Sequence, residues 1–167
     1  MSSPEKYIKR SIRSMPPSGI RKYFDLINEL DGVISLGIGE PDFVTPWQIR
    51  EAGIYALEKG HTHYSANAGI KELRREISSY LKRKYDVSYE ADDEIIVTVG
   101  ASEGIDLALK AILEPGDEVV VPEPSFVAYK GCIRASGGVP VTLELKEENL
   151  FKINPAELEA AVTDKTK

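Results

Sequence analysis

The second half of this chain alternates short β-branched runs with helix-like segments, and this alternation most restricts its fold. The runs end at turn signals and are predicted strands, at residues 95–99, 119–121 and 139–145. Between them, apolar residues recur at helical intervals over 105–112 and 127–135. Because parallel strands are joined by crossover helices, this order predicts the α/β class, with a mostly parallel sheet flanked by helices.

One more helix is predicted after the last strand. It starts with a capping side chain at Asn154, a first-turn proline at Pro155 and an acid at Glu157. The sequence of 167 residues then stops without a further strand. A sheet of three strands would leave apolar faces short of cover, so we expect these residues to be the front part of a longer protein.

The first residues are expected to form an arm. Residues 1–19 are polar and carry prolines, which indicates an extended segment. Apolar spacing over 20–30 predicts a short helix, and residues 33–36 resemble a strand that leads into a loop at 37–43.

Two amphipathic helices are predicted next. The first has three adjacent start signals, a capping hydroxyl at Thr45, a first-turn proline at Pro46 and a capping-box amide at Gln48. Gly60 should end it. The second follows Gly69, and its basic residues over 71–75 and 82–84 are expected on a solvated face.

The charge balance and the cysteine count limit the partners and the location. Lys and Arg number 21 against 27 Asp and Glu, a net charge of −6, which argues against nucleic-acid binding. No stretch approaches the roughly 20 apolar residues of a membrane span, and the start lacks a secretion signal. Cys132 is the only cysteine, so we expect a cytoplasmic protein without disulfides, and its thiol is interpreted as packing.

The junction at 97–104 is the strongest candidate for a binding site. A predicted buried strand passes through Gly100, Ala101 and Ser102 directly into a helix. The first amides of a helix have no backbone acceptor and carry the positive end of its dipole, so a phosphate could bind them. The alternative is a tight turn that holds only water, and the junction alone does not separate the two.

Ser102 also allows a rival interpretation. Gly100-x-Ser102-x-Gly104 between strand and helix matches the nucleophile elbow of α/β-hydrolases. Such an enzyme needs a histidine after the serine, whereas His61 and His63 both precede it. These two histidines are also too few for a zinc site, so no metal is expected.

Five motifs together resemble a known family. They are Ser-Leu-Gly-Ile-Gly-Glu-Pro-Asp-Phe at 35–43 with Thr45-Pro46, His63-Tyr64 with Gly69-Ile70 and Leu73-Arg74, Gly100-Ala101-Ser102-Glu103, Pro115-Gly116-Asp117, and Pro122-Glu123-Pro124-Ser125-Phe126. In this order they are similar to the N-terminal portion of class I/II aminotransferases, fold-type I enzymes that use pyridoxal 5′-phosphate. The resemblance runs from about residue 18 to the end.

The resemblance implies a role for each site residue. Ala101 and Ser102 would bind the cofactor phosphate, and Phe126 would stack on the pyridine ring. Tyr64 would reach the phosphate of the partner subunit in a homodimer, and the Gly39 amide would bind the substrate α-carboxylate. Glu103 would give structural support only. The plainer interpretations are core aromatics at Phe126 and Tyr64, and a simple turn at Gly39.

The resemblance also implies what is missing. The family's Schiff-base lysine would lie beyond Lys167, so no catalytic residue is expected in this chain, and the 167 residues alone should be inactive. Residues 1–45 would form the arm and a small-domain segment, and residues 46–167 the first part of the large cofactor-binding domain. The implied reaction moves an amino group between an amino acid and a 2-oxo acid in amino-acid metabolism. A pyridoxal-phosphate-dependent C–S β-lyase is the alternative within the family, and the α/β-hydrolase using Ser102 is the alternative outside it.

Overall fold

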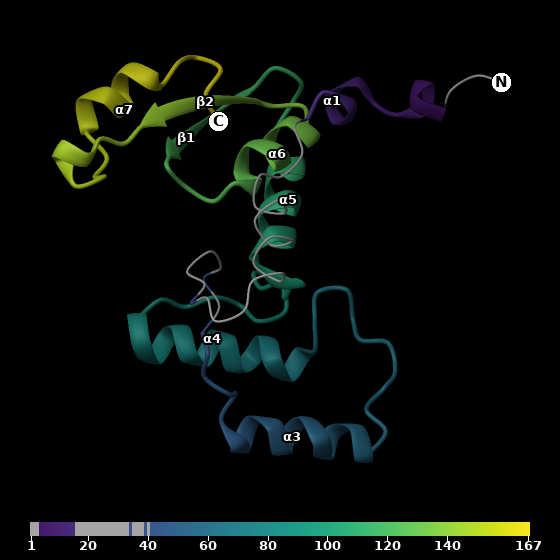
Figure 1. Ribbon diagram of the computed structural model, residues 1–167. Helices are drawn as coiled ribbons and strands as arrows, with labels where there is room; N and C mark the ends of the chain where they lie inside the picture. Colours follow the sequence, from purple (N-terminus) through teal and green to yellow (C-terminus); the bar gives the residue numbers. More distant parts are fainter. Residues whose placement is uncertain (1–3, 16–33, 35–38, 40) are drawn as a thin grey trace. The chain divides into compact units, whose positions relative to one another are not determined.

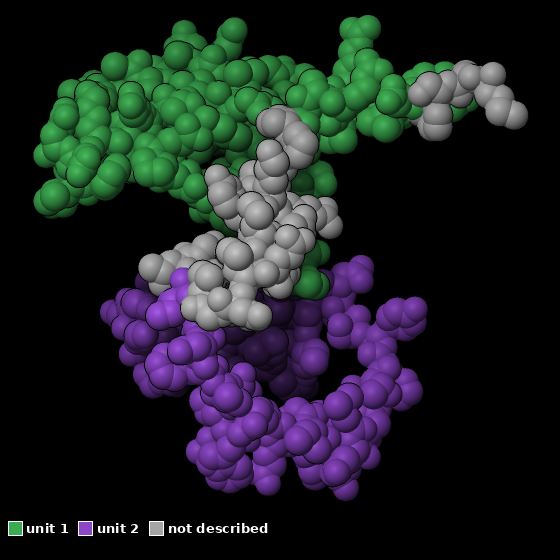
Figure 2. Space-filling view, in the orientation of Figure 1, with its two compact units in different colours: residues 1–19, 99–167 green, residues 20–98 purple. Residues whose placement is uncertain are grey.

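The computed structural model describes residues 4–15, 34, 39 and 41–167 (Figure 1). The predicted helix at 20–30 lies outside the described residues, as does most of the predicted strand at 33–36. The chain divides into two compact units (Figure 2). We call residues 1–19 and 99–167 the sheet unit, and residues 20–98 the helix unit, and describe each by itself. The predicted division at residue 45 concerns the domains of the complete fold and stays a prediction.

The sheet unit is built around two parallel strands, as the sequence pattern predicts. β1 (Glu118–Glu123) pairs with β2 (Val139–Glu144) in a register that sets Val121 opposite Thr142. Helix α6 (Ala128–Ala135) is the crossover between them, and α5 (Gly100–Ile112) precedes β1 (Figure 1). This confirms the α/β class with a parallel sheet.

A small core joins these elements. Leu113, Val121 and Ile133 are buried together, one each from the end of α5, from β1 and from α6. The chain leaves α6 through Gly137, whose φ of +92° suits glycine. The next residue, Gly138, passes so close to the core that a Cβ there would lie 2.8 Å from Leu113 Cδ1. The two glycines therefore let the chain turn tightly from α6 into β2.

The predicted strand at 95–99 is wrong for the described structure. No ladder forms over these residues, and Ile96 and Val99 are exposed although Ile95 is buried. A strand needs a partner, and β1 already pairs with β2 along one edge and with Thr166 at Glu118 along the other. The β-branched composition of this run therefore did not indicate strand pairing in the described structure.

The ends of the sheet unit show one prediction confirmed and one corrected. Helix α7 (Pro155–Ala161) begins as predicted, with Asn154 Oδ1 accepting a hydrogen bond of 3.0 Å from the Ala156 amide. A short 3-10 helix, η2 (Glu147–Asn149), precedes it. The arm is not fully extended, because it contains η1 (Pro4–Tyr7) and α1 (Arg10–Arg13).

The helix unit contains α3 (Trp47–Glu58) and α4 (Lys71–Tyr85). The predicted Thr45 cap of α3 is wrong: Pro46 is the N-cap, and no side chain caps the helix. Thr45 therefore lies one residue too early to reach the second- or third-residue amide. The predicted end is confirmed, since Gly60 has φ +74° and the His61 amide donates to the Ala56 carbonyl in a Schellman arrangement. Within the part of the chain that is described, no helix has the length and apolar character needed to span a membrane.

Candidate functional site

The first turn of α5 forms the candidate anion site. Val99 is the N-cap, and its own amide donates to the Glu103 carboxylate. Ala101 and Ser102 follow in the first turn, where amides have no acceptor within the helix. Both residues are exposed, and the Ser102 hydroxyl has no hydrogen-bond partner among the described residues. The turn therefore presents two amides and one hydroxyl to the surface, at the positive end of the helix dipole.

The backbone at the start of this turn is shaped by glycine. Gly100 has φ +78°, a conformation that L residues rarely adopt, and no atom lies within 4 Å of the place a Cβ would take. The open space above the turn allows a phosphate to approach the backbone. The helix begins at the predicted glycine, and the small residues Ala101 and Ser102 follow in its first turn.

Phe126 lies just beyond the carboxyl end of β1, the end of a parallel strand at which α/β proteins place ligands. Its side chain is half-exposed, at 49%. The ring meets Tyr129 edge to face, with the centroids 5.5 Å apart and the planes at 79°. Phe126 is therefore not a core aromatic among the described residues. One neighbouring ring orients it, and about half of its surface remains available for stacking.

Tyr129 also ties this ring to the body of the sheet unit. An apolar cleft of about 210 Å³ opens between α5, β1 and α6, and Leu109, Val119 and Tyr129 are among its lining residues. The helix that presents Ser102 and the helix that begins behind Phe126 thus line one cleft. The sheet unit therefore contains three of the predicted site residues: Ala101, Ser102 and Phe126.

Tyr64 and Gly39 belong to the helix unit and are described within it. The Tyr64 side chain is fully exposed, at 107%, in the connector between α3 and α4. No atom lies within 4 Å of a Cβ built on Gly39. Tyr64 is thus not a core aromatic here, and its phenol is available to a partner. The roles of both residues remain predictions.

The lysines of the sheet unit near this site are engaged in ion pairs. Lys110 Nζ lies 2.6 Å from Asp106 on the same helix, and Lys130 Nζ lies 2.6 Å from Glu123 at the end of β1. Lys110 lies on α5 and Lys130 on α6. No group of three His, Cys, Asp or Glu side chains gathers as a metal centre would require, within the described ranges.

Arg74 is a functional candidate that the sequence interpretation missed. It was expected on a solvated face of α4, and this is wrong: it is buried, with only 7% of its surface exposed. Its Nη1 donates to the carbonyl oxygens of Ala91 and Asp92, at 2.5 and 3.0 Å. The signal was available, because Arg74 lies four residues after Ile70 and three before Ile77, on the apolar face of the helix. Its neighbour Arg75 is exposed, as predicted.

Asp92 completes this network. Its carboxylate lies 2.8 Å from Lys71 Nζ and 3.9 Å from Arg74 Nη2. The hydrogen bond from Lys71, with help from the charges of Lys71, Arg74 and Arg75, lowers the pKa of Asp92 below its ordinary value. The carboxylate is accordingly held in its ionised form at neutral pH.

Comparisons with known proteins agree with the sequence motifs. The model of the family described as aminotransferase class I and II matches residues 31–167. YugH of Bacillus subtilis (strain 168), whose name gives it provisionally as an aminotransferase, is 53% identical over 161 residues, which are 96% of this chain and 42% of that protein. An aspartate aminotransferase of Pyrococcus abyssi is 46% identical over 151 residues, 90% of this chain and 39% of that protein.

A solved structure gives the same result for the fold. The aspartate aminotransferase of Thermus thermophilus with maleate matches with a TM-score of 0.87 and 36% identity, over 96% of this chain and 43% of that one. This chain spans about two fifths of the length of the curated relatives it matches.

Proposed function

Because this chain belongs to the aminotransferase class I and II family, we propose that it supplies the cofactor-phosphate site of a pyridoxal 5′-phosphate-dependent enzyme. The reaction moves an amino group between an amino acid and a 2-oxo acid. The observation that carries the proposal is the first turn of α5, where Ala101 and Ser102 are exposed and Gly100 leaves open space beside them. Backbone amides and a hydroxyl at the positive end of a helix are donors of the kind that a phosphate accepts.

The donors of this turn are well suited to a dianion. Each charge-assisted hydrogen bond contributes about 1.5–3 kcal/mol, and the helix dipole adds to it. The Glu103 carboxylate accepts its hydrogen bond from the Val99 amide and so does not compete with a phosphate for the Ala101 and Ser102 donors. The site thus fits a phosphate without a lysine or arginine from the same turn.

Phe126 would hold the cofactor ring. A stacked aromatic contributes about 1 kcal/mol beyond the burial of its area, and it orients the ring without reacting. Tyr129 supports Phe126 from one side and leaves the other part of its surface exposed. The bound cofactor supplies an electron sink for bonds at the amino-acid Cα, while these residues bind and orient it.

The substrates and the assembly follow from the same proposal. Gly39 would offer its amide to the substrate α-carboxylate, since no side chain obstructs the approach there. Tyr64, fully exposed, would donate its phenol to the phosphate of a partner subunit, which makes the enzyme a homodimer with a shared site. The catalytic lysine would come from outside residues 1–167. The single cysteine, Cys132, agrees with a reducing cytoplasm.

The test uses the full-length protein, purified and supplied with pyridoxal 5′-phosphate. It is incubated with L-aspartate or an aromatic amino acid together with 2-oxoglutarate, and new amino acids are identified by chromatography and mass. We expect amino transfer that depends on the cofactor. Release of pyruvate from cystathionine without any 2-oxo acid would instead identify the C–S β-lyase. Cofactor-independent ester hydrolysis with phosphonate labelling at Ser102 would support the hydrolase and contradict the proposal.

A further inference from the structure

Arg74 is the buried charged residue of the helix unit, among the residues that the structure describes. Burying a guanidinium is costly unless it is hydrogen-bonded, and here it donates to two consecutive backbone carbonyls, those of Ala91 and Asp92. Both hydrogen bonds come from one nitrogen, Nη1, while Nη2 lies 3.9 Å from the Asp92 carboxylate. The residue at this position is thus matched to holding a stretch of backbone.

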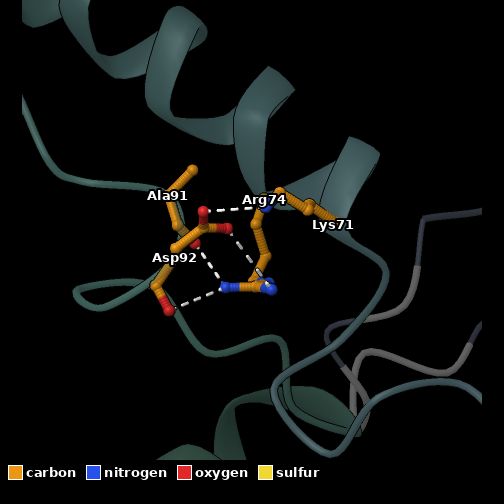
Figure 3. A network of polar contacts seen from close by, with 4 residues as sticks. All are labelled: Lys71, Arg74, Ala91 and Asp92. Carbon is orange, nitrogen blue, oxygen red and sulfur yellow. Dashed lines mark hydrogen bonds and ion pairs between the residues drawn. The ribbon is translucent and has the colours of Figure 1, made fainter.

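The backbone that Arg74 holds is a turn at 91–94, directly before the run of residues 95–99 that leads to α5. Lys71, one helical turn earlier on α4, holds the side chain of the same Asp92 at 2.8 Å (Figure 3). Just before the turn, the Ser78 hydroxyl donates to the Tyr89 carbonyl at 2.6 Å. Three side chains of α4 therefore hold the segment 89–92 against this helix.

The far end of the same run is held as well. The Val97 amide donates to the Ala68 carbonyl at 3.0 Å. Gly69, with φ +95°, allows this approach, because a Cβ there would lie 2.7 Å from Val97 Cβ. The run is thus pinned near Asp92 and again at Val97, and only Thr98 and Val99 separate it from Gly100, where α5 begins.

We infer that Arg74 is a positioning residue for the phosphate site: by fixing the turn at 91–94, it limits the conformational freedom of the segment that leads into the first turn of α5. The inference rests on the proposed function. Ordering a loose backbone segment costs conformational entropy, and a site whose approach is already ordered does not incur that cost when the phosphate binds. Arg74 acts through the chain and has no contact with the cofactor in this scheme.

The variants are Arg74→Met, Arg74→Lys and, as the matched control, Arg75→Met at the exposed neighbouring position on the same helix. In the full-length protein we expect Arg74→Met to raise the Kd for pyridoxal 5′-phosphate roughly tenfold, equivalent to about 1.4 kcal/mol. Arg74→Lys should recover part of this loss, and Arg75→Met should stay within about twofold. Hydrogen exchange should become faster at the Val97 amide in Arg74→Met only.

A purely structural role would lower the urea midpoint of Arg74→Met and leave the Kd of the folded protein unchanged. A Kd equal to that of Arg75→Met therefore overturns the inference while the proposed function stands. If the wild-type protein does not bind the cofactor at all, the proposed function fails, and the inference fails with it. Should Arg74→Met not fold, Arg74→Lys and Lys71→Met decide in its place, since each loosens the same turn without emptying the buried site.

Discussion

The Glu103 carboxylate accepts a hydrogen bond from the backbone amide of Val99, four residues earlier, at the N-cap of α5. This contact satisfies one of the amides that a helix start leaves unpaired, and it places the negative charge at the positive end of the dipole. The Val99 amide is thus used within the turn, whereas the amides of Ala101 and Ser102 belong to the first turn, which has no acceptors within the helix. The sequence prediction that Glu103 has a supporting role is consistent with this geometry.

Glu103→Ala should therefore destabilise the start of α5. Loss of a capping hydrogen bond costs about 1 kcal/mol, which urea unfolding of the full-length protein would detect. Glu103→Gln keeps an acceptor oxygen and should lose less than half of that. Glu159→Ala, at an exposed helical position without such a contact, is the control and should change the stability little. Equal losses in the Glu103→Ala and Glu159→Ala variants would contradict the capping role.

Ser102→Ala tests the phosphate contact. The substitution removes the hydroxyl but keeps the backbone amide, so one charge-assisted hydrogen bond is lost and the Kd for pyridoxal 5′-phosphate should rise about tenfold. Absorbance titration of the full-length apoprotein measures this. Ser79→Ala on α4, also exposed, provides the matched control. A Kd for Ser102→Ala that equals the control value would exclude the hydroxyl from binding.

We expect cofactor affinity to fall when the aromatic ring of Phe126 is removed, but not when a polar hydroxyl is added to that ring. Phe126→Leu keeps an apolar side chain but removes stacking worth about 1 kcal/mol, so cofactor affinity should fall about fivefold. Phe126→Tyr should stay close to the wild type. Phe151 has a similar exposure, 50% against 49%, which makes Phe151→Leu the control. Tighter or unchanged binding in Phe126→Leu would show that the ring does not meet the cofactor.

Asp92→Asn tests the ion pair through its pH dependence. The pKa of Asp92 is lowered in the folded protein, chiefly by the hydrogen bond from Lys71, so the folded state binds this proton less tightly than the unfolded chain. The stabilisation is present above the ordinary aspartate pKa, near pH 4, and is lost as the pH falls through the lower folded value. The stability difference between wild type and Asp92→Asn should shrink as the pH falls from 5 to 2.

Urea midpoints measured at each pH give this difference. Asp93→Asn changes the neighbouring exposed carboxylate and serves as the control, with a smaller difference at neutral pH. The carbonyl of residue 92 still accepts from Arg74 in the Asp92→Asn variant, so the turn itself should persist. If the stability difference between wild type and Asp92→Asn stays constant down to pH 2, the ionised Asp92 carboxylate does not stabilise the folded protein.

How far the sequence predicts this structure depends on how local each signal is. Asn154 and Gly60 act on residues two to five positions away, and the start of α7 and the end of α3 were predicted correctly. The run at 95–99 was not, because strand pairing depends on a partner distant in the sequence, and β1 pairs with β2 and, at Glu118 alone, with Thr166. Sequence composition alone does not indicate with which strand a β-branched run pairs.

In the candidate site, too, some residues are placed by local sequence signals and others by contacts with distant parts of the chain. The exposed helix start at Ala101 and Ser102 follows from a local strand-to-helix pattern and could be predicted. The burial of Arg74 depends on a turn 17 residues further along the chain, whose carbonyls have no distinguishing sequence signal. Helical spacing could have placed Arg74 on the apolar face, but the preference of arginine for the surface outweighed it.

Gly138 offers a last test, which concerns the packing that supports the site. A Cβ at this position would lie 2.8 Å from Leu113 Cδ1, 3.1 Å from Ile133 Cγ2 and 3.2 Å from the Asp117 carbonyl oxygen. Two of these neighbours belong to the core and one is backbone, so they cannot all move away without opening the contact between α6 and β1. Gly138→Ala should therefore cost about 1–3 kcal/mol of unfolding free energy, as overpacking does.

The control is Gly53→Ala, the same glycine-to-alanine change at a position where we expect the opposite effect on stability. Gly53 lies inside α3, and no atom is within 4 Å of a Cβ built there. Gly53→Ala adds the better helix former at no steric cost and should stabilise the protein by up to about 1 kcal/mol. Urea unfolding should thus shift in opposite directions for the two variants. A shift of the same sign in both would mean that the core around Leu113 is looser than the contacts at Gly138 indicate.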